Sequence, residues 1–143
     1  MGDAIVGGTL MQDKPTATEL LDALAVFLRD EVAPRLDGGL RFKALVGANV
    51  AGIVSREIAL GAGQDRAQLE RLRTLLASPD PDGNCDDLAG RVRELSFELC
   101  RRIDAGDADS GPWRDEVIAH LRATVDEKLA IDNPKLLRSS TTR

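Results

Sequence analysis

The segment A-L-V-G-A-N-V-A-G-I-V-S, residues 44–55, decides the fold. It contains one strongly polar residue, Asn49, and no charge. Charged residues lie on both sides of it: Arg41, Lys43, Arg56 and Glu57. A helix that is apolar all round is typical of a buried helix. The segment therefore predicts a central, mostly apolar helix over about residues 40–60, against which the other helices pack.

The composition favours helices throughout the chain. The 143 residues are rich in Leu, Ala, Arg and Glu, which are strong helix formers, and contain only three Phe, one Trp and no Tyr. β-branched residues form no alternating run. A chain of this length favours one domain with a single core. We therefore expect an all-α, single-domain bundle of about five helices.

Turn and capping residues set the expected boundaries of these helices. Thr16 and Glu19 have the spacing of a capping box, Pro34 disfavours helix in the residue before it, and Gly61 is a natural residue to follow a helix end. The predicted helices cover residues 17–32, 40–60, 64–77, 85–105 and 112–131. Residues 1–11 are predicted to be a disordered tail, residues 12–138 the bundle, and residues 139–143 a frayed end.

Charge and termini exclude several partners. The net charge is −5, and the interspersed acidic and basic residues argue against nucleic acid, which needs a concentrated basic face. No apolar run approaches the roughly 20 residues of a membrane-spanning helix, and the start lacks a signal peptide's basic and apolar regions. We therefore expect a cytoplasmic protein without membrane contact.

The cysteines carry no motif. Cys85 and Cys100 are expected to be reduced in the cytoplasm, and neither belongs to a C-x-x-C pair. We expect neither a metal nor a cofactor.

Small residues recur at helical spacing in the central helix, on two adjacent rows: Ala44, Ala48 and Gly52, and Gly47, Ala51 and Ser55. Such rows let another helix approach closely, and tight packing is the preferred interpretation; a ligand slot against Gly52 is the alternative. Gly47 and Gly52 match the start of a phosphate-binding loop. However, Ile53-Val54 stands where that loop needs Lys and Ser or Thr, so this motif is rejected.

A candidate ligand site lies on one sector of the same helix. At about 100° per residue, Arg41, Asn49 and Arg56 share that sector, and two cations with an amide suit a carboxylate or phosphate. Glu31 is a fourth candidate, as a base or as an ion-pair partner of either arginine. The structural alternative is a buried, hydrogen-bonded Asn49 with arginines that are solvated or paired.

His120 is the single histidine. It lies near the apolar stripe of the helix at 112–131, and packing beside Trp113 is preferred over a role as general base. Di-iron bundles need Glu-x-x-His on two helices. The spacing of Glu116 and His120 differs from that pattern, which excludes this class.

Phe97 faces away from the apolar seam of its own helix. A single exposed aromatic side chain is normal on a protein surface. It is also a candidate hot spot for a homodimer.

Three segments resemble a known family: M-Q-D-K-P-T-A-T-E-L-L at residues 11–21, the helix at 41–58 with its Ala48-Asn49 pair, and K-L-A-I-D-N-P-K-L at 128–136. Over residues 11–138 the chain resembles a bacterial family of short all-helical proteins of unknown function. Its members tend to be encoded beside acyl-CoA dehydrogenases and aminoglycoside-phosphotransferase-like kinases. The resemblance implies an accessory role in acyl-CoA or hydroxy-acid catabolism, and it carries over no catalytic residue.

Two hypotheses follow from the sequence. The first is a non-catalytic helical accessory module that binds such a dehydrogenase or kinase, with a homodimer as a further candidate assembly. The second is a protein that binds a small anionic ligand, such as an acyl-CoA, or a minor enzyme, with its site at Arg41, Asn49, Arg56 and Glu31.

Overall fold

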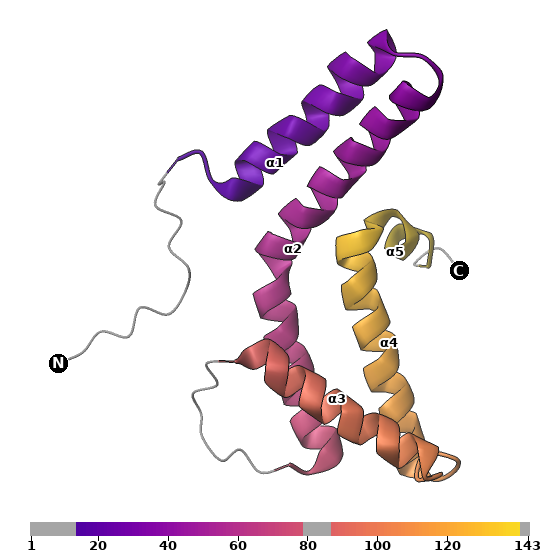
Figure 1. Ribbon diagram of the computed structural model, residues 1–143. Helices are drawn as coiled ribbons and strands as arrows, with labels where there is room; N and C mark the ends of the chain where they lie inside the picture. Colours follow the sequence, from indigo (N-terminus) through magenta and orange to yellow (C-terminus); the bar gives the residue numbers. More distant parts are fainter. Residues whose placement is uncertain (1–13, 79–86, 141–143) are drawn as a thin grey trace, which may run out of the picture. The chain divides into compact units, whose positions relative to one another are not determined.

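The computed structural model describes residues 14–78 and 87–140, and within these ranges the regular elements are all helices (Figure 1). The α-helices are α1 (Ala17–Val26), α2 (Gly38–Leu76), α3 (Leu88–Asp104), α4 (Pro112–Asp132) and α5 (Pro134–Ser140). The expected all-α fold, with five helices and one long central apolar helix, is confirmed for the described ranges. The predicted tail at 1–11, the residues between 79 and 86, and the last three residues lie outside them.

The start of α1 follows the predicted capping box. The Thr16 hydroxyl accepts from the Glu19 N–H at 3.2 Å, and the Glu19 carboxylate accepts from the Thr16 N–H at 2.7 Å. The hydrogen bond from the Thr16 N–H, together with the side chains of Thr16 and Lys14, holds the pKa of the Glu19 carboxyl below its ordinary value. Two otherwise unpaired backbone donors are thereby satisfied.

The end of α1 differs from the prediction. The α-helix stops at Val26 and continues as a wider π-helical segment, Phe27–Val32, and a 3-10 turn, Ala33–Arg35. Here the Ala33 N–H donates to the Leu28 carbonyl, one residue further back than in an α-helix. Pro34 explains the change, because it has no N–H to continue the regular pattern.

The predicted break in the central helix at Gly61 is wrong, because α2 runs unbroken through Leu76. A glycine inside a helix lowers helix stability by about 1 kcal/mol. Packing of the residues further along α2 offsets this cost. Leu69, Leu72 and Leu75 are buried in the following turns, and the Gln64 side chain donates to the Glu127 carbonyl at 3.0 Å. The two predicted helices at 40–60 and 64–77 are therefore one element.

Both α2 and α3 end in a Schellman motif, in which the residue after the helix adopts positive φ. In α3 this residue is Gly106, with φ +90°, as its glycine predicts. In α2 it is Ala77, with φ +49°, and the Ser78 N–H donates to the Arg73 carbonyl at 3.1 Å.

The chain divides into two compact units, and α2 contributes to both. Unit 1 ends at Ala59 and unit 2 begins at Leu60.

Unit 1 is a helical hairpin in which α1 runs antiparallel to the first part of α2 (Figure 1). The small residues of α2 face α1, as predicted: Ala48, Ala51 and Ser55 are buried, and the Ser55 hydroxyl donates to the Thr18 carbonyl at 3.5 Å. The prediction of burial all round is wrong, because one helix covers only one side of α2. Asn49 is exposed, so its interpretation as a buried amide is also wrong.

Unit 2 contains the larger apolar core. Its buried members are Leu69, Leu72 and Leu75 of α2, Val92, Leu95 and Leu99 of α3, and Val117 of α4. The Trp113 indole N–H donates to the Leu75 carbonyl at 3.0 Å, which joins α4 to the end of α2. Leu121 and Val125 are about half exposed, because no described element of unit 2 covers that side of α4.

Candidate functional site

The most distinctive surface of unit 1 is a ridge of apolar side chains along α2. It follows an i, i+4 spacing, which places successive residues next to one another on a helix. Its members are exposed by 41–68%: Phe42, Val46, Val50, Val54 and Ile58. Soluble monomers rarely expose a contiguous apolar row of this length.

A stripe on α1 extends this surface. Leu20, Leu24 and Phe27 are 47–50% exposed, while Ala25 on the other side of α1 is buried against α2. At about 100° per residue, and with the helices antiparallel, the stripe faces the same side of the hairpin as Val54 and Ile58. Leu40, 62% exposed, lies on that side near the hairpin turn. We call these nine residues of ridge, stripe and Leu40 the association face.

The predicted anion-binding residues lie apart from this face. Arg41, Asn49 and Glu31 are exposed, and Arg56 is half-buried beside Gly52. Arg41 and Arg56 are fifteen residues apart, which corresponds to about 22 Å along the helix axis. One small anion therefore contacts at most one of the two arginines, and the ligand hypothesis stays a prediction.

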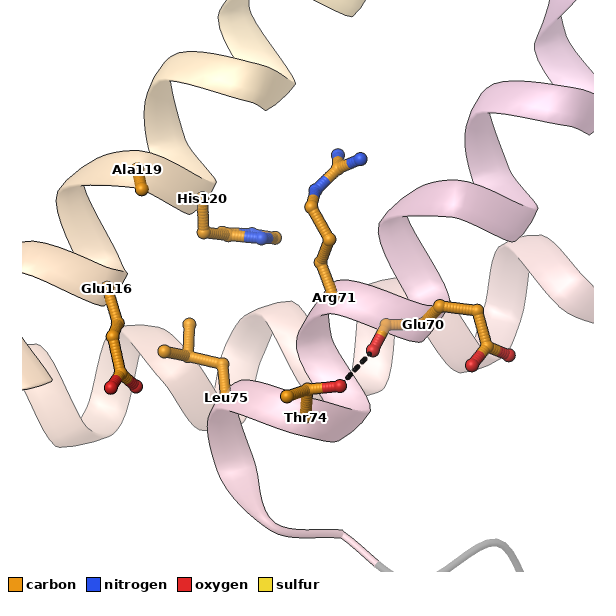
Figure 2. Close-up of a pocket in the computed structure, with 7 residues that line it drawn as sticks. All are labelled: Glu70, Arg71, Thr74, Leu75, Glu116, Ala119 and His120. Atoms are coloured by element: carbon orange, nitrogen blue, oxygen red, sulfur yellow. Dashed lines mark hydrogen bonds between the residues drawn. The ribbon is translucent and has the colours of Figure 1, made fainter.

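A cavity of about 460 Å³ lies in unit 2 between α2 and α4 (Figure 2). Its described lining comes from the two helices: Glu70, Arg71, Thr74 and Leu75 of α2, and Glu116, Ala119 and His120 of α4. Figure 2 shows the His120 imidazole extending from α4 toward the side chain of Arg71 on α2.

Arg71 of the cavity lining also belongs to an ion pair between the two helices. The Arg71 guanidinium donates two hydrogen bonds to the Glu127 carboxylate, at 2.8 and 2.6 Å. Arg71 and Glu127 are 30% and 23% exposed at their side chains. A two-point contact of this kind fixes the orientation of both groups and is stronger than a neutral hydrogen bond. It ties α2 to α4.

His120 lies beside this pair and is buried, with 6% of its surface exposed. Burial lowers the pKa of its imidazole, the Arg71 cation lowers it further, and the Glu127 carboxylate opposes the shift. His120 is therefore neutral at pH 7. Its Nδ1 and the Nε of Arg71 are both buried without a hydrogen-bonding partner.

The cavity does not form a nucleophilic site in the structure. Thr74 is the hydroxyl residue in its lining, and this hydroxyl donates to the Glu70 carbonyl of its own helix at 3.0 Å. His120 thus faces an ion pair rather than a nucleophile, and a role in holding α2 against α4 fits its burial. The expected packing of His120 beside Trp113 stays a prediction, because the structure records no contact between them.

Sequence reasoning missed Arg71 and Glu127. They are 56 positions apart, and each occurs in an ordinary charged stretch of a helix, so no local pattern marks them. The sequence pattern assigns the apolar residues of α2 to a buried core, although several of them are exposed. A pattern of apolar residues predicts that a surface is buried, but it does not predict whether the same chain or another chain buries it.

These observations define a class: a small all-helical protein with a row of exposed apolar side chains on its longest helix. Its described residues hold no cluster of His, Cys, Asp or Glu side chains that could bind a metal ion. Residues 34–136 match the domain of unknown function DUF6285, and the chain belongs to this family. The match confirms the expected membership of an uncharacterised family, and it spans α2, α3 and α4. No curated protein and no solved structure matches the chain.

Proposed function

We propose that this protein is a helical interaction module, which works by binding another protein chain through the association face on α1 and α2. The observation that carries the proposal is the ridge from Phe42 to Ile58, whose five apolar side chains are 41–68% exposed. Exposed apolar area of this extent costs free energy in water, and covering it drives association.

The size of the association face supports this function. Full burial of one large apolar side chain contributes about 1.5–3 kcal/mol. At about 25 cal/mol per Å², this free energy corresponds to about 60–120 Å² of apolar surface removed from water. Nine side chains that are about half exposed therefore offer roughly 300–500 Å². One side of a standard interface buries about 800 Å², of which about 65% is apolar in homodimers. The face thus approaches the apolar area of a stable interface.

A lipid bilayer is a less suitable occupant. The helix Gly38–Leu76 is long and apolar enough to cross a membrane by length and composition, with 17% of its apolar window buried. However, the uncharged segment 44–55 spans only about 18 Å along the helix axis, against a hydrocarbon core of about 30 Å. Arg56 and Glu57 follow it immediately.

The finer part of the proposal concerns the pathway. The resemblance described above supports a cytoplasmic accessory role in acyl-CoA or hydroxy-acid catabolism, with an acyl-CoA dehydrogenase or an aminoglycoside-phosphotransferase-like kinase as a partner. The lack of a nucleophile at the cavity beside His120 supports a role without catalysis.

The proposal is tested with Val50→Asp, which places a charge at the centre of the ridge. Asn49→Asp is the matched control, because it adds the same charge at an exposed neighbouring position off the ridge. Molar mass is measured by light scattering, at micromolar concentration, for the chain alone and mixed with each enzyme. We expect an assembly that Val50→Asp abolishes and Asn49→Asp retains. A monomer that binds neither enzyme, or an assembly that Val50→Asp leaves intact, contradicts the proposal.

A further inference from the structure

We infer that the occupant of the association face is a second copy of this chain, and that two hairpins form an antiparallel four-helix bundle centred on Val50. This inference rests on the proposed function, because it names the partner for the same face. Three observations support it. They are the symmetric spacing of the ridge residues about Val50, the position of Leu24 of α1 level with Val50, and the placement of Lys43 and Glu57.

The ridge is symmetric about Val50. Val46 and Val54 lie four residues on either side, and Phe42 and Ile58 lie eight residues on either side, all of them exposed. In a two-fold symmetric interface a residue i contacts j of the partner, and j contacts i. When two copies of α2 pack antiparallel with Val50 at the axis, Val46 of each copy lies level with Val54 of the other. At about 100° per residue the ridge winds around α2, so Phe42 and Ile58 lie on opposite flanks of this contact.

The stripe on α1 fits the same axis. Thr18 lies level with Ser55, which donates to its carbonyl, and Leu28 lies beside Gly47. Between these two contacts, Leu24 is level with Val50. The two-fold axis that places Val50 against Val50 therefore places Leu24 against Leu24, and Leu20 and Phe27 lie on either side of it. Both helices of the hairpin thus join one continuous interface.

Two charges complement one another in this register. Lys43 and Glu57 lie seven residues on either side of Val50, and both are exposed. Neither forms an ion pair or hydrogen bond through its side chain with another described residue. In the antiparallel dimer Lys43 of each copy approaches Glu57 of the other, which gives two equivalent ion pairs at the ends of the ridge. A parallel dimer brings Lys43 near Lys43 and Glu57 near Glu57, and like charges disfavour it.

The register is tested by cysteine cross-linking in a Cys85→Ser/Cys100→Ser background. Val50→Cys is expected to form a disulfide-linked dimer on mild oxidation. Val46→Cys alone is expected to stay uncross-linked, because it faces Val54 of the other copy, whereas a mixture of Val46→Cys and Val54→Cys cross-links. Efficient self-linking of Val46→Cys, as in a parallel dimer, overturns the antiparallel register.

Exchanging the charges of Lys43 and Glu57 provides a second test. Both side chains are exposed, so their substitution is expected to leave the fold of one copy intact. Lys43→Glu is expected to weaken the dimer about tenfold, because two ion pairs of up to about 1 kcal/mol each are lost. The double variant Lys43→Glu/Glu57→Lys is expected to restore the wild-type dissociation constant. Failure of the double variant to restore it overturns the pairing.

The remaining outcomes separate this inference from the proposed function. A monomeric wild type that binds the dehydrogenase or kinase, with Val50→Asp abolishing the complex, overturns the second copy as occupant and leaves the proposed function standing. A monomeric wild type that sediments with phosphatidylglycerol–phosphatidylcholine vesicles, and binds neither enzyme, overturns both.

Discussion

At the residue scale, His120 and the Arg71–Glu127 pair combine burial with charge in unit 2. The sequence places a single histidine near an apolar stripe and favours its packing beside Trp113, but it does not decide whether the imidazole is buried. Arg71 comes from a helix about fifty positions earlier, so no periodicity within α4 reports it, whereas Glu127 lies about two turns further along α4 itself. The predicted anion site differs from this case. Helical spacing places Arg41, Asn49 and Arg56 on one sector of α2, but the rise per residue separates Arg41 from Arg56 by about 22 Å along the axis.

The lowered pKa of His120 predicts a definite pH dependence of stability. The unfolded chain takes up a proton near pH 6.5, whereas folded His120 resists protonation. The unfolded state then binds more protons below pH 6.5, so the free energy of unfolding decreases as the pH falls from about 7 toward the folded pKa. NMR titration of this single histidine is expected to give a midpoint below 6.5.

Chemical denaturation of wild type and His120→Gln between pH 7.5 and 5.5 checks this linkage. The wild type is expected to lose stability relative to the variant as the pH falls. A histidine midpoint at or above 6.5 contradicts the structural account of this cluster.

The ion pair between α2 and α4 predicts an unequal effect of two similar substitutions. Glu127→Gln removes one charge from a two-point contact that is partly buried, and is expected to lower the free energy of unfolding by about 1–2 kcal/mol. Glu94→Gln is the control, because Glu94 pairs with Arg91 within one exposed helix face. Its effect is expected to stay below about 0.5 kcal/mol. Equal effects in urea denaturation contradict the role given to Arg71–Glu127.

At the element scale, local chemistry predicts where most described helices begin and end. Thr16 and Glu19 cap α1, Pro112 opens α4, and Gly106 follows α3, each as its residue type indicates. Gly61 is the exception. Its local preference for a helix end is small, and the burial of Leu69 and Leu72 beyond it exceeds that preference. Local sequence therefore predicts the elements well and fails where distant packing determines continuity.

The continuity of α2 predicts that Gly63→Ala is stabilising. Gly63 lies inside the helix, and a Cβ added there meets no atom within 4 Å. Alanine is favoured over glycine in a helix by about 1 kcal/mol, so the free energy of unfolding is expected to rise by up to that amount. A loss of stability in thermal or urea denaturation indicates a break between two helices, as the sequence first suggested.

The two Schellman motifs predict opposite effects of exchanging glycine and alanine. Ala77 and Gly106 occupy equivalent positions with positive φ. Ala77→Gly is expected to raise the free energy of unfolding, and Gly106→Ala to lower it, by about 1 kcal/mol each. Changes of the same sign at both positions contradict the assigned helix ends.

At the scale of the whole molecule, the sequence predicts the fold class and the apolar character of α2, but not what covers α2. Segment 44–55 was expected to be buried on all sides, yet only its small residues contact α1, and Val46, Val50 and Val54 are exposed. In the proposed dimer, this apolar pattern belongs to a core that two chains share. A dimer also makes the melting temperature rise with protein concentration, because association stabilises the folded state by mass action.

The measurement that tests this account most directly is sedimentation equilibrium of the wild type, Val50→Asp and Phe97→Ser. The account predicts twice the chain mass of 15.4 kDa for the wild type and a monomer for Val50→Asp. Phe97, 66% exposed on α3 of unit 2, is outside the association face, so Phe97→Ser is expected to remain a dimer. Circular dichroism verifies that each variant keeps its helices. A wild-type monomer, or a dimer that Phe97→Ser dissociates and Val50→Asp does not, contradicts the account.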